Sequence, residues 1–266
     1  MRNNEYPSSA GPDYSEVTEV PGNRLSVEAL DMMRLRYTFA GEICAGKNIL
    51  EVACGAGQGL GLLAGKARSV VAGDYTERLL HLAREHYGSG MNLVRLDAHR
   101  LPFRAGSFDV VLLYEAIYYL ASAEEFIGEC RRVLRSGGTV LICTVNREWP
   151  DFNPSPLSTR YFSAGELVRL LRAGGFQVET RGAFQVSRIS PKDAIVSLAK
   201  RAARSMRLIP KTMKGKEFLK RIFLGRLVPM PVEIPGFPAY SAAPEPIPSS
   251  GRISGYKVIF AIGQAR

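Results

Sequence analysis

The sequence of 266 residues has few cysteines, few histidines and no long apolar run. Its four cysteines form no C-x-x-C pair and are too few to cross-link a chain of this length, so we expect reduced thiols and a cytoplasmic protein. Three scattered histidines predict no metal site. No stretch reaches about 18 apolar residues without a charge, and the first twenty residues are polar and acidic. We therefore expect neither a membrane-spanning helix nor a signal peptide.

Basic residues are in excess in one segment only. Residues 188–226 carry twelve Lys or Arg and two acidic residues, whereas the rest of the chain holds 23 of each sign. The formal net charge of +10 therefore belongs to this segment. It is interpreted as a solvated amphipathic lid, as a contact for an acidic or carrier-bound substrate, or as a contact with an anionic membrane surface. Nucleic acid is disfavoured, because no aromatic residues for base stacking are interleaved with the basic ones in residues 192–216.

Short apolar runs alternate with helical patterns from residue 48 onward. The expected strands are residues 48–52, 69–74, 92–97, 108–114, 139–145, 176–184 and 256–265. The expected helices are residues 26–40, 60–66, 76–87 and 123–134. Ser122 with Glu125, and Ser163 with Glu166, fit the capping box of a helix start. This alternation predicts an α/β fold with a doubly wound, mostly parallel sheet covered on both faces.

The composition divides the chain into three parts. Residues 1–25 are expected to be a flexible N-terminal tail, and residues 26–187 with 256–266 a single binding domain. Residues 188–255 form a basic, proline-rich insertion, which we expect to act as a substrate lid. Seven prolines between residues 229 and 248 predict an extended strap without regular structure.

The most informative segment is residues 49–59, ILEVACGAGQG, in which an apolar strand ends near an acid and breaks into glycines. Small residues at 53, 55 and 57 let the backbone pass close to a ligand. Neither a dinucleotide-binding G-x-G-x-x-G frame nor a P-loop fits the segment. Asp74 closes the next strand nineteen residues after Gly55, which is the spacing expected of an acid that binds both hydroxyls of a ribose.

These segments resemble the class I S-adenosylmethionine-dependent methyltransferases, in particular the small-molecule, type 11-like members. The resemblance covers residues 26–186 and 256–266, and the stretches that carry it are residues 49–57, 70–74, 96–103, 107–111 and 132–138. Ala53 departs from the family's D/E-x-G-x-G-x-G turn, where a first glycine is usual. The resemblance implies S-adenosyl-L-methionine as the cofactor. It also implies a seven-stranded sheet, a Rossmann-like methyltransferase fold in which only the last strand runs antiparallel.

The resemblance also implies roles for individual cofactor-binding residues. Glu51 would lie near the methionine amino group, and Gly55 and Gly57 under the methionine and the ribose. Asp74 would contact the ribose hydroxyls and Tyr75 the adenine ring. Asp97 and Ala98 would contact the edge of the adenine. Ala53 and Tyr114 are the remaining implied cofactor-binding residues. Arg36 or Tyr37, on the preceding helix, is the candidate contact for the cofactor's carboxylate.

Glu115, Tyr118 and Tyr119 follow the fourth strand, where a methyl acceptor should approach. Glu115 is the candidate base for a hydroxyl or amine, and the two tyrosines are further catalytic candidates. The alternative is that the tyrosines pack on the sheet and Glu115 is a structural hydrogen-bond acceptor. His99 is expected to be an exposed loop residue.

The leading hypothesis is therefore a methyltransferase that acts on an oxygen or nitrogen of a small molecule. Two alternatives come from other classes. One is a non-catalytic module that binds S-adenosylmethionine or S-adenosylhomocysteine. The other is an RNA methyltransferase that uses the basic insertion, which predicts steeply salt-dependent RNA binding. The sequence makes no prediction of the oligomeric state.

Overall fold

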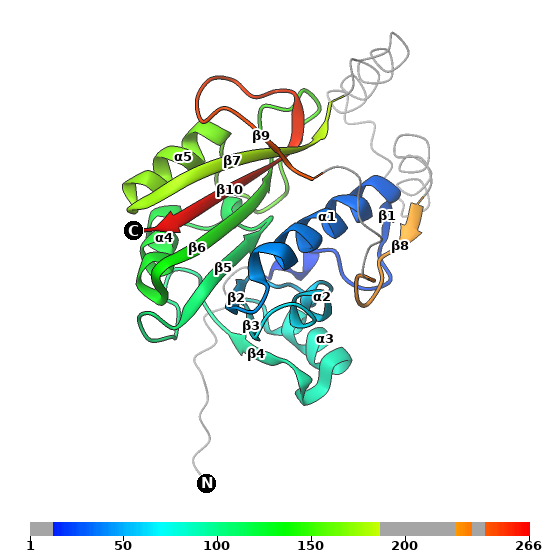
Figure 1. The fold of residues 1–266 in the computed structure, drawn as a ribbon. Helices are drawn as coiled ribbons and strands as arrows, with labels where there is room; N and C mark the ends of the chain where they lie inside the picture. Colours follow the sequence, from blue (N-terminus) through cyan, green and yellow to red (C-terminus); the bar gives the residue numbers. More distant parts are fainter. Residues whose placement is uncertain (1–12, 187–226, 236–242) are drawn as a thin grey trace.

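The computed structural model describes residues 13–186, 227–235 and 243–266. An eight-stranded sheet with the order β4-β3-β2-β5-β6-β10-β7-β9 runs through this part (Figure 1). The strands are β2 (Asn48–Val52), β3 (Ser69–Asp74), β4 (Asn92–Arg95), β5 (Phe108–Tyr114), β6 (Leu134–Val145), β7 (Phe176–Gln185), β9 (Glu245–Pro246) and β10 (Tyr256–Ala265). The α-helices are α1 (Val27–Cys44), α2 (Leu60–Ala64), α3 (Glu77–Tyr87), α4 (Ala123–Val133) and α5 (Ala164–Ala173).

Helices cover both faces of the sheet, as the strand and helix alternation predicts. Helices α1, α2 and α3 lie on one face, and α4 and α5 lie on the other (Figure 1). Alternate residues of β5 divide between two apolar clusters, because successive side chains of a strand point to opposite faces. Val110 and Leu112 pack with the residues of α1 and α2, whereas Val111 and Leu113 pack with those of α4 and α5. The predicted fold class is confirmed.

The number of strands differs from the predicted seven. Strand β10 runs antiparallel to both β6 and β7, as expected, but β9 also pairs antiparallel with the outer side of β7. The prediction that only the last strand is antiparallel was therefore wrong. The proline-rich strap supplies β9, and Pro246 is tolerated there because an edge strand leaves one row of backbone groups unpaired.

The chain before α1 is also built into the structure. It contains a single 3-10 turn, η1 (Tyr14–Glu16), and strand β1 (Arg24–Ser26), which pairs antiparallel with β8 (Leu227–Pro229). Leu25 is buried against Leu30 and Met230, and this burial holds the pair of strands on α1. Residues 13–25, predicted to belong to a flexible tail, are thus packed on the domain, whereas the calls on residues 1–12 and 187–226 lie outside the described residues.

The carboxyl ends of the parallel strands β2, β3 and β5 lie together at one edge of the sheet. The strand order reverses between β2 and β5, because the chain continues outward from β2 through β3 to β4 and then returns to start β5. In open parallel sheets, ligands bind in the crevice at the carboxyl ends of the strands beside such a switch point. The turn after β2 and the segment after β5 both open onto this crevice.

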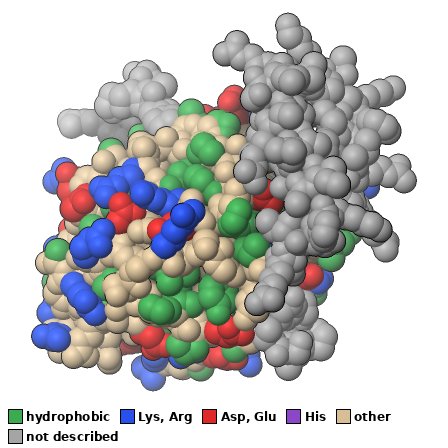
Figure 2. All heavy atoms as spheres, turned by 90° about the horizontal axis from the view of Figure 1, so that it is seen from above, with side chains coloured by type: hydrophobic (Ala, Val, Ile, Leu, Met, Phe, Trp, Pro, Cys, Tyr) green, Lys and Arg blue, Asp and Glu red, His purple; other side chains and the backbone are tan. Residues whose placement is uncertain are grey.

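The surface of the described part mixes charges of both signs. Figure 2 shows Lys and Arg side chains beside Asp and Glu on the face drawn there, interspersed with apolar side chains. None of the helices within the described ranges has the length and apolar character needed to cross a bilayer. Among the same residues, no group of three or more His, Cys, Asp or Glu side chains could hold a metal ion.

Candidate functional site

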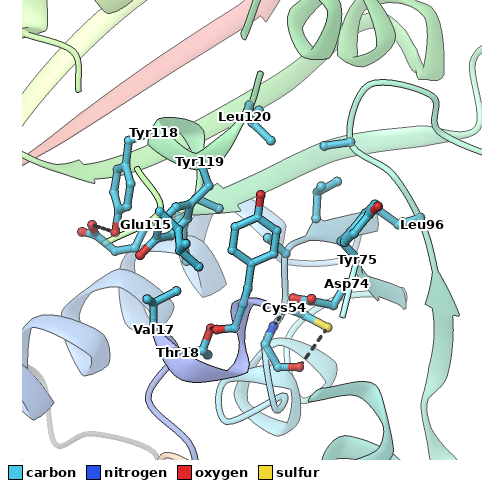
Figure 3. Close-up of a pocket in the computed structure, with 18 of the residues that line it drawn as sticks. Val17, Thr18, Cys54, Asp74, Tyr75, Leu96, Glu115, Tyr118, Tyr119 and Leu120 are labelled. Atoms are coloured by element: carbon cyan, nitrogen blue, oxygen red, sulfur yellow. Dashed lines mark hydrogen bonds between the residues drawn. The ribbon is translucent and has the colours of Figure 1, made fainter. Parts of the chain in front are cut away.

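A cavity of about 590 Å³ lies at the carboxyl ends of β2, β3 and β5 (Figure 3). This volume is within the usual range for sites that bind small molecules. The predicted site residues that line it are Tyr37, Ala53, Gly55, Asp74, Tyr75, Asp97, Ala98, Tyr114, Glu115, Tyr118 and Tyr119. Glu51 and Gly57 are the two predicted site residues that do not line it. Segments far apart in the sequence therefore meet in one space.

The turn after β2 takes a left-handed path. Ala53, Gly55 and Gly57 have φ angles of 59°, 58° and 81°. Glycine adopts this conformation freely, whereas another residue pays about 1–2 kcal/mol, so the alanine at the first position is accommodated with strain. A side chain at Gly57 would also press on Leu60 and Ala83, each 3.1 Å from the place of its Cβ. The turn thus has little room for larger side chains, and its residues Ala53, Cys54 and Gly55 line the cavity.

Asp74 holds this turn from the end of β3. Its Oδ2 accepts a hydrogen bond from Gly55 N at 2.9 Å, and its Oδ1 accepts one from Thr76 N at 2.8 Å. Burial raises the pKa of Asp74, and the backbone donors from Thr76, Gly55 and Tyr75 act in the opposite direction. A carboxylate has about four acceptor positions, so Asp74 keeps at least one for a ligand.

Glu51 lies one layer behind the cavity wall and is 1% exposed. Its Oε1 accepts a hydrogen bond from the Tyr37 hydroxyl at 2.6 Å, whereas its Oε2 is buried without a partner among the described residues. The pKa of Glu51 is raised to about 8, chiefly by burial. The charge of Asp74 also raises this pKa, and the hydrogen bond from Tyr37 acts in the opposite direction. Tyr37 itself lines the cavity and lies so close to Gly59 that a Cβ there would overlap its ring. Tyr37, which lines the cavity, thus donates a hydrogen bond to Glu51, which does not line it.

His99 lies in the turn that follows β4, as expected of a loop residue, but it lines the cavity and its side chain is only 22% exposed. Its Nδ1 lies 2.6 Å from Asp97 Oδ1, and its Nε2 accepts a hydrogen bond from Ser122 N at 3.2 Å. Because Nε2 is the acceptor, the ring proton is on Nδ1 and is donated to Asp97. His99 therefore orients the carboxylate of Asp97 and ties it to the start of α4. The Asp-x-His spacing after a predicted strand was the available signal.

Glu115 begins the segment after β5 with a left-handed φ of 48°. Its Oε1 accepts from Arg36 at 2.6 Å, and its Oε2 accepts from Val145 N at 3.2 Å. The Oε2 atom also accepts from the Tyr118 hydroxyl at 3.1 Å (Figure 3). Burial lowers and Glu115 raises the pKa of Arg36, which lies above its ordinary value on balance. Arg36 was a candidate for the cofactor's carboxylate, and the structure pairs it with Glu115.

Apolar side chains surround this end of the cavity. They are Val17, Met33, Leu120, Ala121 and Leu157. The ring of Tyr118, which belongs to the single turn η3 (Ile117–Tyr119), stacks on Tyr161 at 4.3 Å. The hydroxyl of Tyr119 lies 2.6 Å from Ser155 Oγ. Both tyrosines thus line the cavity and also pack on neighbouring side chains, and their catalytic role stays a prediction.

Residues before α1 also form part of the cavity wall, although no sequence pattern predicts this. Tyr14, Val17, Thr18 and Glu19 all line the cavity. Figure 3 shows Val17 beside Glu115 and Tyr119, on the side of the cavity away from Asp74. No helical or strand periodicity marks these residues. Their role follows only from where the chain passes.

Comparison of the sequence with known proteins finds a matching family model and several similar proteins. A family model described as a methyltransferase domain matches residues 50–142. A probable S-adenosylmethionine-dependent methyltransferase of Mycolicibacterium smegmatis is 37% identical over 158 residues, which cover 57% of this chain and 60% of the relative. A ubiquinone biosynthesis O-methyltransferase of Thiobacillus denitrificans is 27% identical over 56% of this chain and 73% of its own. The chain thus spans about 60% of the length of the first of these relatives.

The solved structures agree on the fold. A crystal structure of an S-adenosylmethionine-dependent methyltransferase from Archaeoglobus fulgidus superposes with a TM-score of 0.56 at 14% identity, over 88% of this chain and 94% of that one. At this identity the likeness concerns the architecture of sheet and helices alone. The matching domain and the shared architecture agree: residues 50–142 are similar to the methyltransferase-domain family, and the described part of the chain has the fold of the S-adenosylmethionine-dependent methyltransferases.

Proposed function

We propose that this protein transfers the methyl group of S-adenosyl-L-methionine to a hydroxyl oxygen of a largely apolar small molecule. One observation carries the proposal. A single cavity joins the turn after β2 and Asp74 to an apolar wall that holds the carboxylate of Glu115. Donor and acceptor sites thus share one space, as an in-line transfer between two bound molecules requires.

The residues of the turn fit the cofactor of the family. Ala53, Cys54 and Gly55 of the left-handed turn line the cavity, Asp74 keeps at least one acceptor position, and Glu51 has a buried oxygen without a partner among the described residues. A buried, unpartnered carboxylate oxygen is unfavourable unless a donor reaches it, and the cofactor's ammonium group is such a donor. When bound, the cofactor supplies a methyl group already activated on a sulfonium.

The chain's own residues would bind and orient the two reactants. In this proposal Asp74 accepts from the ribose hydroxyls, Asp97 accepts from the adenine amine, and the backbone of Ala98 donates to the ring. Tyr75 packs beside the adenine. Gly57, which does not line the cavity, shapes the turn, and Tyr114 packs on Tyr37 with ring centroids 5.4 Å apart.

Glu115 is the proposed base. Its Oε2 already accepts two hydrogen bonds, whereas Oε1 accepts one from Arg36, so Oε1 has a position left for the acceptor's hydroxyl. Arg36 stabilises the negative charge and fixes the direction of the carboxylate. The name of one relative, a ubiquinone biosynthesis O-methyltransferase, supports oxygen as the acceptor atom. Transfer to nitrogen is the second candidate of the same site.

Cofactor affinity is expected to rise with pH between about pH 6 and about pH 8. The folded-state pKa of Glu51, about 8, lies above its ordinary value of 4.5, so the protein without cofactor holds a proton there that the bound ammonium expels. Calorimetry at several pH values should show up to about a tenfold gain per pH unit. Glu51→Gln, which has no proton to lose, should abolish the slope.

The same shift has a consequence for stability, which serves as a control. Because the folded state binds the proton more tightly than the unfolded chain, the contribution of Glu51 to the free energy of unfolding falls as pH rises from about 4.5 to about 8. Urea titrations of the protein without cofactor should show this fall in the wild type and not in Glu51→Gln. A wild-type affinity that is flat across this range would contradict the assignment of Glu51.

Labelled methyl transfer tests the function itself. The wild type is incubated with methyl-labelled S-adenosylmethionine and with matched phenols, aliphatic alcohols and amines of similar apolar size. We expect label in an ether product of a hydroxyl acceptor, identified by mass spectrometry. Cofactor binding without transfer to any acceptor would favour the non-catalytic module. Transfer to RNA, with steeply salt-dependent binding, would favour the RNA methyltransferase.

A further inference from the structure

The N-terminal arm, defined as residues 13–26, lies directly on the loops that follow β2 and β3. The Cγ2 atom of Thr18 is 3.3 Å from the place that a Cβ would take on Gly55. The backbone N–H of Tyr14 donates to Thr76 Oγ1 at 3.3 Å. The arm therefore contacts both chain segments that form the adenosine end of the cavity.

Gln58 attaches the arm to the turn after β2. Its side chain is buried, and its Nε2 donates to Glu19 O at 2.8 Å. Its backbone carbonyl accepts from Ile234 N at 2.7 Å. Farther along the arm, Met230 N donates to Asn23 O at 2.7 Å beside the β1 and β8 pairing. Two segments that are more than 200 residues apart are thus joined to each other and to the same turn.

The ring of Tyr14 lies between the two ends of the cavity. Its centroid is 6.2 Å from that of Tyr75 at the adenosine end and 5.2 Å from that of Tyr119 at the acceptor end. Burial raises the pKa of Tyr14, and the charges of Tyr75, Asp97 and Asp74 raise it further. No predicted site residue bridges both ends in this way.

We propose that the arm is the cover of the cofactor site and that Tyr14 is a further cofactor-contacting residue whose ring packs on the adenosine moiety. The inference rests on the proposed function. Because the arm forms part of the cavity wall and Gln58 holds it there, the cofactor enters and leaves with the arm displaced. The closed arm excludes water from the reacting groups.

The test measures binding of S-adenosylmethionine and S-adenosylhomocysteine by calorimetry, and dissociation of the latter by stopped flow. Tyr14→Ala should weaken both affinities about tenfold, mainly through faster dissociation, because a ring stacked on a base is lost. Tyr14→Phe keeps the ring and should stay within about twofold of wild type. The matched control is Glu16→Ala, an exposed position of the same turn that does not line the cavity.

A second variant examines the cover without altering Tyr14. Gln58→Glu replaces the donor to Glu19 O by an acceptor, so the arm is released and dissociation should accelerate about tenfold as well. Urea midpoints show whether each variant is folded. Unchanged dissociation in both variants, or tighter binding by Tyr14→Ala, would overturn the inference alone. A wild type that binds neither ligand would overturn the proposed function, and the inference with it.

Discussion

Replacing Asp74 with alanine is expected to weaken cofactor binding by at least about a hundredfold, equivalent to about 3 kcal/mol. The carboxylate accepts hydrogen bonds from Gly55 N and Thr76 N, so it shapes the turn after β2. In the proposed complex it also accepts from the ribose. Each hydrogen bond to a charged group contributes about 1.5–3 kcal/mol, and the variant loses both kinds together.

The two contributions can be separated with a ligand that lacks the ribose 2′-hydroxyl. If Asp74 binds the ribose, removing this hydroxyl weakens binding to the wild type but has little further effect in Asp74→Ala. Asp109→Ala is the matched control. That carboxylate also accepts a backbone hydrogen bond, from Asn48 N at 2.8 Å, but it does not line the cavity. If Asp74→Ala and Asp109→Ala bind the cofactor with equal affinity, the proposal that Asp74 binds the ribose is wrong.

Replacing Glu115 with glutamine is expected to lower kcat by about a hundredfold while the affinity for cofactor stays within about threefold. The amide keeps an oxygen that can accept from Arg36, so the surroundings are preserved, but it cannot take a proton from a hydroxyl. Single-turnover rates with a hydroxyl acceptor, together with calorimetry of the cofactor, measure the two quantities separately.

Tyr118→Phe is the comparison variant for Glu115. It removes one donor from Oε2 and leaves Oε1, the oxygen proposed to face the acceptor, with its contact to Arg36. Its kcat should fall by less than about tenfold. Equal losses in the two variants, or no loss in Glu115→Gln, would show that Glu115 positions the segment after β5 and does not take the proton.

Local sequence patterns were sufficient to predict the parallel sheet and the acids at the carboxyl ends of its strands. Apolar runs with turn residues between them mark β2, β3 and β5, and both hydrogen bonds of the capping box between Ser163 and Glu166 are present at the start of α5. The acids that end strands follow from the same reading, because parallel strands bring their carboxyl ends to one edge. Asp74 and Asp97 therefore line the cavity as expected.

Contacts between distant segments were not accessible in this way. Arg36 and Glu115 are 79 residues apart, and nothing in either neighbourhood distinguishes an ion pair from two separate roles. Strand β1 has three residues, and its partner β8 begins 203 residues after it. The short strand β9 and the place of His99 beside the cavity were missed for the same reason.

Periodicity records which face of an element is apolar and where the element begins and ends, and these properties are set by neighbours along the chain. The succession of strands and helices along the chain, the small residues in the turn after β2 and the acid on β3 are of this kind, and the amino-acid sequence alone specified them. The cover formed by residues 13–26, the pairing of Arg36 with Glu115 and the recess of Glu51 behind Tyr37 came from packing. Which surfaces meet is decided by the path of the whole chain, because burial and hydrogen bonding select partners by position in space.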